Sequence, residues 1–154
     1  MSHRSVVAGT KTLENCKELF AQQAMNAIKL ELFADRADFS GYTEVSDVFR
    51  SIARVEKEQA KQIFRIMEDE LGEDLTTGAP VGETDANIEA VLSSKKAEIE
   101  TLEEYMGTAQ KEELDWVEEL FDTISSAKER QVFILEDTLE EFQKREGEEE
   151  ASEE

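Results

Sequence analysis

The second half of this 154-residue sequence repeats the first half at a fixed spacing of 72 residues. The motif Thr12-x-x-Asn15 returns as Thr84-x-x-Asn87. The same offset, without a gap, relates three further pairs: Phe49 and Phe121, Ile52 and Ile124, and Gln59 and Gln131. A repeat of this length predicts two equivalent structural units related by an approximate twofold axis.

Each half contains two long segments in which apolar residues alternate at three- and four-residue spacing, the pattern of one face of an α-helix. The first segment begins near Thr12, and the second follows a turn at residues 40–43, with Thr43 as its expected N-cap. Thr84 is the expected N-cap of the third segment. The stretch Met106-Gly107-Thr108 is expected to separate the third helix from the fourth.

Residues 72–83 form the one long connection and contain the only proline, Pro80. Its length suits a crossover between parallel helices rather than a tight hairpin. We therefore expect an all-α fold, an antiparallel four-helix bundle with one long crossover between helices 2 and 3. The expected boundaries are a flexible tail at 1–9, the bundle at 10–145 and a disordered acidic tail at 146–154.

Polar residues replace apolar ones in the middle of all four apolar stripes. The repeat places them at corresponding sites of the two halves, so we expect them to share one polar layer in the core. The positions are Gln23, Glu56, Gln59, Lys95, Glu98, Lys128 and Gln131. Two carboxylates facing two ammonium groups balance in charge, and an unpaired buried charge would cost several kcal/mol.

The two T-x-x-N starts, the segment Phe20-Ala21-Gln22-Gln23 and the motif Glu56-Lys57-Glu58-Gln59-Ala60-Lys61 resemble the ferritin-like domain of rubrerythrins. The resemblance covers residues 10–142. It implies a di-iron centre, built from carboxylates and two Glu-x-x-His pairs, and the reduction of hydrogen peroxide, often with electrons from a rubredoxin domain.

Transferred to this sequence, the family's ligand positions are the seven polar positions named above. Only Glu56 and Glu98 keep a ligand of the family's kind. A protonated lysine has no lone pair to offer a metal, so we expect no metal and no cofactor, and Lys95 and Lys128 paired to Glu56 and Glu98 in its place.

This interpretation predicts a non-enzymatic structural or interaction protein. The main alternative is a rubrerythrin-type, metal-dependent oxidoreductase or peroxidase that binds iron through Glu56 and Glu98. A lysine nucleophile would need a lowered pKa, whereas a neighbouring carboxylate raises the pKa of a lysine.

The formal net charge of −21 disfavours binding to nucleic acid or to an anionic membrane. The single cysteine, Cys16, excludes an internal disulfide and a CxxC-type site within this sequence, and the only histidine, His3, lies outside the helical patterns. With neither a signal peptide nor a long apolar run, we expect a cytoplasmic protein. The resemblance makes a homodimer the expected assembly, and the sequence identifies no other protein partner.

Overall fold

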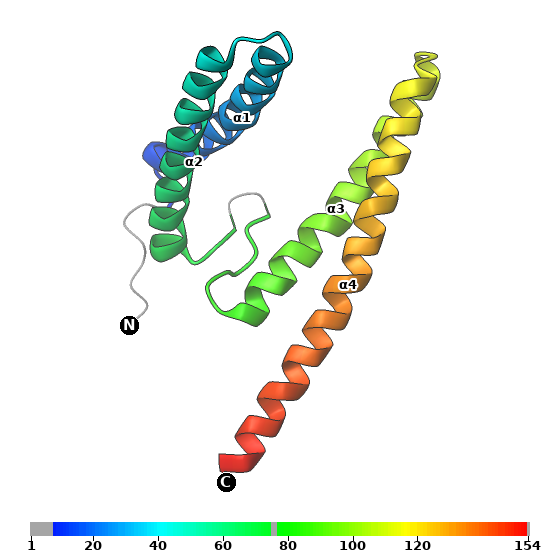
Figure 1. Cartoon of the computed structure of the whole chain (residues 1–154). Coiled ribbons are helices and arrows are strands. Elements are labelled where there is room, and N and C mark those ends of the chain that lie inside the picture. Colours follow the sequence, from blue (N-terminus) through cyan, green and yellow to red (C-terminus); the bar gives the residue numbers. More distant parts are fainter. Residues whose placement is uncertain (1–7, 75–76, 154) are drawn as a thin grey trace. The chain divides into compact units, whose positions relative to one another are not determined.

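A computed structural model describes residues 8–74 and 77–153 and contains four α-helices (Figure 1). They are α1 (Lys11–Phe39), α2 (Thr43–Leu71), α3 (Thr84–Lys111) and α4 (Asp115–Glu153). The longest connection lies between α2 and α3. The predicted all-α fold of four helices with one long crossover is confirmed, and none of these helices combines the length and apolar character that a membrane span requires.

The chain divides into two compact units, an α1/α2 hairpin and an α3/α4 hairpin, and each is described by itself. In the first hairpin, small buried residues at intervals of seven form the contact between the helices. Ala27 and Ala34 lie on α1, and Ser46, Ala53 and Ala60 lie on α2. Residues seven apart lie on one side of a helix, and side chains this small let two helices approach closely.

The second hairpin uses the same principle, with Ala90, Leu102 and Ala109 buried on α3 and Ser125 buried on α4. Helix α4 has 39 residues against 28 in α3, so its C-terminal end extends past the first turn of α3 (Figure 1). The small contact residues leave the large apolar side chains on the flanks of each hairpin. Phe33 on α1 and Phe133 on α4, for example, are 51% and 72% exposed.

Two helices begin one residue before their predicted starts. The N-caps of α2 and α3 are Tyr42 and Glu83, and neither side chain makes a capping hydrogen bond. The carbonyl oxygens of these two residues already accept the first helical hydrogen bonds, from Ser46 N at 3.0 Å and from Asn87 N at 2.9 Å. Thr43 and Thr84 are therefore the first helical residues, and their prediction as N-caps is wrong.

The motif residue Asn87 acts at the start of α3. Its Oδ1 accepts a hydrogen bond from Gly82 N at 2.8 Å, and Gly82 has a φ of 125°. That φ is available to glycine at little cost. The T-x-x-N motif of the second half thus fastens the end of the long connection to the first turn of the helix.

Gly107 does not end α3, which continues to Lys111, so the predicted break at residues 106–108 is wrong. A glycine inside a helix costs only about 1 kcal/mol relative to alanine. Burial of Ala109 against the hairpin favours one more turn of helix. The chain turns instead at Glu113, which has a φ of 57°.

Residues 146–153 are helical in the structure, which corrects the prediction of a disordered acidic tail. Glutamate is a good helix former, and Gly147 is the one poor helix former among these residues. The predicted flexible tail lies mostly outside the described residues, apart from Ala8 and Gly9, which form the turn before the N-cap Thr10.

Candidate functional site

The seven predicted site residues fall into two groups. Gln23, Glu56 and Gln59 belong to the α1/α2 hairpin, whereas Lys95, Glu98, Lys128 and Gln131 belong to the α3/α4 hairpin. All seven lie near the middle of their helices, as the sequence predicts.

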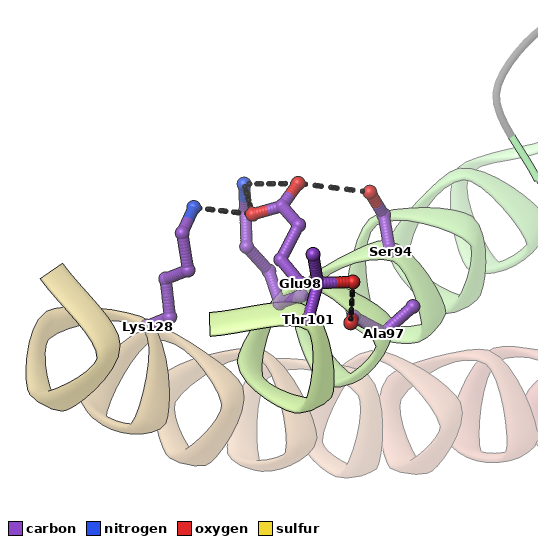
Figure 2. A network of polar contacts seen from close by, with 6 residues as sticks. Ser94, Ala97, Glu98, Thr101 and Lys128 are labelled. Atoms are coloured by element: carbon purple, nitrogen blue, oxygen red, sulfur yellow. Dashed lines mark hydrogen bonds and ion pairs between the residues drawn. The ribbon is translucent and has the colours of Figure 1, made fainter. Parts of the chain in front are cut away.

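Glu98 is the centre of the group in the α3/α4 hairpin. Its Oε2 accepts a hydrogen bond from Lys95 Nζ at 3.1 Å on the same helix and a second one from Lys128 Nζ on α4. Its Oε1 accepts a hydrogen bond from Ser94 Oγ at 3.1 Å. Figure 2 shows the Glu98 carboxylate between Lys128 and Ser94, so that one carboxylate binds two ammonium groups and joins the two helices.

This network is half-buried. The side chains of Lys95, Lys128 and Glu98 are 26%, 21% and 37% exposed. Burial raises the pKa of Glu98, but the hydrogen bonds from Lys128, Lys95 and Ser94 outweigh burial, so that the pKa of this carboxyl lies below its ordinary value. The carboxylate form is therefore stabilised.

The group in the α1/α2 hairpin is held by a hydrogen bond between two amides. Gln23 Nε2 on α1 donates to Gln59 Oε1 on α2 at 2.9 Å. Within residues 8–74 and 77–153, the buried Gln23 Oε1 accepts no hydrogen bond. Glu56 is half-buried and likewise has neither a hydrogen bond nor an ion pair with any described residue. This group therefore has one negative charge and one buried acceptor that remain unsatisfied.

The predicted distribution of the ion pairs is corrected in one respect. The sequence suggested that the two lysines pair with Glu56 and Glu98, one carboxylate each, whereas the structure shows both lysines on Glu98. Lys95 lies three residues before Glu98 on the same helix face, so this local pair forms inside one hairpin. Ser94 was not predicted, although its position four residues before Glu98 is a signal that could have identified it.

Gln131 is exposed and makes no hydrogen bond with the part of the chain that the structure describes. An open groove of about 480 Å³ lies beside the network and is lined by Glu98, Lys128 and Tyr105, among others. The Tyr105 ring packs against Phe121, with the ring centroids 5.9 Å apart.

The described residues contain no group of three or more His, Cys, Asp or Glu side chains that could hold a metal ion. The predicted fallback ligands Glu56 and Glu98 belong to different hairpins, and Glu98 is already bound to two lysines. The only histidine, His3, lies outside the described residues.

The lowered pKa of Glu98 predicts a specific response to acid. A carboxyl with a depressed pKa in the folded state stabilises the protein fully above its unfolded-state pKa, and this stabilisation is lost as the pH falls through the folded pKa. We expect the stability of the chain to decline below about pH 4.5, and the decline to be smaller in Glu98→Gln. Denaturant unfolding between about pH 6 and about pH 3 measures it.

Glu140→Gln is the matched control for this experiment, because Glu140 pairs with Lys144 on the exposed surface of α4 and also has a lowered pKa. Exposed pairs contribute little to stability. An equal or larger effect of Glu140→Gln would contradict the special role of Glu98.

Comparison with known proteins gives a consistent result. The family model described as Rubrerythrin matches residues 14–131. A rubrerythrin of Clostridium perfringens is 35% identical over 63 residues, which are 41% of this chain and 32% of the relative. A rubrerythrin of Nitratidesulfovibrio vulgaris is 28% identical over 127 residues, 79% of this chain and 65% of the relative. A rubrerythrin of Porphyromonas gingivalis is 30% identical over 95 residues, 60% of this chain and 47% of the relative.

The matched segments thus cover between about one third and two thirds of the length of these relatives. The family model, in contrast, covers well over half of this chain and includes all seven site positions. The chain therefore belongs to the rubrerythrin family.

Proposed function

We propose that this chain is a non-enzymatic rubrerythrin-family protein with a structural or interaction role, in which a Lys/Glu/Gln network replaces the di-iron site. One observation carries the proposal: both lysines at ligand-equivalent positions hold the carboxylate of Glu98. The carboxylate that a metal would use is thereby engaged by ammonium groups.

The donor set does not fit a di-iron centre. Iron in such sites prefers carboxylate oxygens and imidazole nitrogens. The seven positions supply two carboxylates, three amides and two lysines. A lysine that is protonated in an ion pair donates hydrogen bonds and adds positive charge where a cation would sit. We therefore derive no reaction step from iron in this chain.

The two hairpins carry complementary charges at these positions. The α1/α2 group has one carboxylate, Glu56, and a net charge of −1. The α3/α4 group has two lysines and one carboxylate, and hence a net charge of +1. We propose that an α1/α2 hairpin pairs with an α3/α4 hairpin so that Glu56 balances the surplus ammonium group and Gln23 Oε1 gains a donor.

The same argument disfavours pairing of a hairpin with its own kind. Two α1/α2 hairpins would bring together two Glu56 carboxylates without a cation, and two α3/α4 hairpins would bring together four lysines and two carboxylates. A half-satisfied buried network is costly. The network would therefore act as a device that selects the correct pairing of helices, a role for which buried polar residues in coiled coils give a precedent. The cytoplasmic location expected from the sequence stays a prediction.

Metal analysis tests the metal-free proposal. We expect protein purified from iron-supplemented cells to contain only substoichiometric iron, manganese and zinc, and anaerobic ferrous iron to leave its melting temperature unchanged, because a ligand stabilises a protein only by binding its folded state. Two iron ions per chain, lost together in the variant Glu56→Gln/Glu98→Gln, would instead support the alternative of a metal-dependent oxidoreductase or peroxidase. A peroxide-consumption assay on the same preparations would then establish the activity.

A further inference from the structure

Helix α1 carries a second apolar stripe, separate from its contact with α2. The stripe consists of Ala21, Met25, Ile28 and Leu32, and Phe39 continues it at the end of the helix. At 100° per residue, these positions point at least about 100° away from the direction of Ala27 and Ala34, which are fully buried in the hairpin. Met25, Ile28 and Leu32 are 64%, 60% and 62% exposed.

The stripe also differs from the flank that carries the polar site residues. Gln23 and Leu30 point to one side of the Ala27 direction, whereas Ile28 and Leu32 point to the other side. Residues 21, 25, 28 and 32 follow the alternating four- and three-residue spacing of a coiled-coil seam. This spacing is what a helix needs to pack against one further helix along its length.

Charge on this helix opposes self-association less than charge elsewhere in the chain. Helix α1 has four basic and five acidic residues, a net charge of −1, while α4 has four basic and fourteen acidic residues, a net charge of −10. Depletion of charge around an apolar centre is typical of protein interfaces. In a chain of net charge −21, α1 is thus a favourable place for two copies to meet.

The charges that flank the stripe are arranged for an antiparallel partner. Glu14 and Glu18 lie on the outward face before the stripe, whereas Arg36 lies on that face after it. A twofold axis between Met25 and Ile28 would place Ala21 opposite Leu32 of a second copy. The same register brings Glu18 beside Arg36 of the second copy. Glu18 has no ion pair with the described residues, and Arg36 lies over the Phe39 ring, 5.8 Å from its centroid.

We propose that this stripe is the interface through which two copies of the chain form an antiparallel α1–α1 homodimer. A twofold interface uses the same patch on both subunits and must be self-complementary. The apolar register and the Glu18–Arg36 register share nearly the same midpoint, so the stripe meets this condition. The inference does not depend on whether the polar site holds a metal.

Sedimentation of the full chain over a range of concentrations tests the proposal. We expect a dimer, and we expect Ile28→Asp to raise its dissociation constant by about 100-fold or more, because two carboxylates would lie at the twofold axis. Phe133→Asp is the matched control, since Phe133 is also a large exposed apolar residue but lies on α4. It should leave the dimer intact.

A charge swap gives a second test that leaves the apolar residues unchanged. Glu18→Arg and Arg36→Glu should each weaken the dimer, whereas the double variant should restore it, because each swapped pair again joins opposite charges. Circular dichroism of every variant checks that the helices remain folded. A monomeric parent chain would overturn the proposal, as would a dimer that Phe133→Asp dissociates and Ile28→Asp does not, or a double charge variant no tighter than the single ones.

Discussion

Restoring the family's ligands at five positions is expected to turn this chain into an iron-binding protein whose stability depends on the metal. The changes are Gln23→Glu, Gln59→His, Lys95→Glu, Lys128→Glu and Gln131→His, with Glu56 and Glu98 kept. Without metal, the variant should be less stable than the parent by several kcal/mol, because five carboxylates would share one region and some would have to take up protons. Ferrous iron at about 100 times its dissociation constant should return about 2.7 kcal/mol.

Thermal melting with and without anaerobic ferrous iron, together with the iron content after desalting, measures this effect. The matched control carries the same five changes with Glu56→Gln and Glu98→Gln added, which removes the two retained ligands. It should show no iron-dependent rise in melting temperature. A folded five-residue variant that iron does not stabilise would refute the proposal that the two hairpins bring these seven positions together.

Removing the shared carboxylate is expected to have the largest effect of any single change in the network. Glu98→Gln leaves the ammonium groups of Lys95 and Lys128 side by side without their counter-ion. We expect a loss of about 1–3 kcal/mol in the free energy of unfolding, between the small value of an exposed ion pair and the larger cost of breaking a buried one. Denaturant unfolding at neutral pH gives the value.

The triple variant Lys95→Met/Glu98→Gln/Lys128→Met provides the comparison, because it removes all three charges at once. It should be more stable than Glu98→Gln, since no ammonium group is left unpaired. Lys95→Met alone should cost less than Glu98→Gln, because Lys128 still neutralises the carboxylate. Losses that simply add up over the three positions would show that the three residues do not form one network.

The differences between prediction and structure have local causes. Gly107 and Gly147 were given the weight of helix breakers, yet α3 and α4 run through both. A glycine costs about 1 kcal/mol in a helix, so its neighbours decide whether the helix ends there. At Gly107 the burial of Ala109 supplies the missing stability, and around Gly147 the run of glutamates keeps a high helix propensity.

The sequence by itself determined the four helices, their division into two equivalent hairpins and the polar positions in their middles. These features follow from the spacing of apolar residues and from the repeat at 72 residues, both of which are local or periodic properties of a chain. The family follows from the same residues. The close contact of α1 with α2 through Ala27, Ala34 and Ala53 could not be predicted in this way, because small residues give no strong periodic signal.

Only the tertiary structure decided how the polar residues are paired. The sequence supplied two carboxylates and two lysines in equal numbers, but charge balance alone does not say which ammonium group reaches which carboxylate. Lys95 meets Glu98 because three residues separate them on one helix, and Lys128 reaches the same oxygen because α4 packs against α3 at that height. Pairing depends on distances of about 3 Å between side-chain atoms, and those distances are set by the packing of helices rather than by the order of residues.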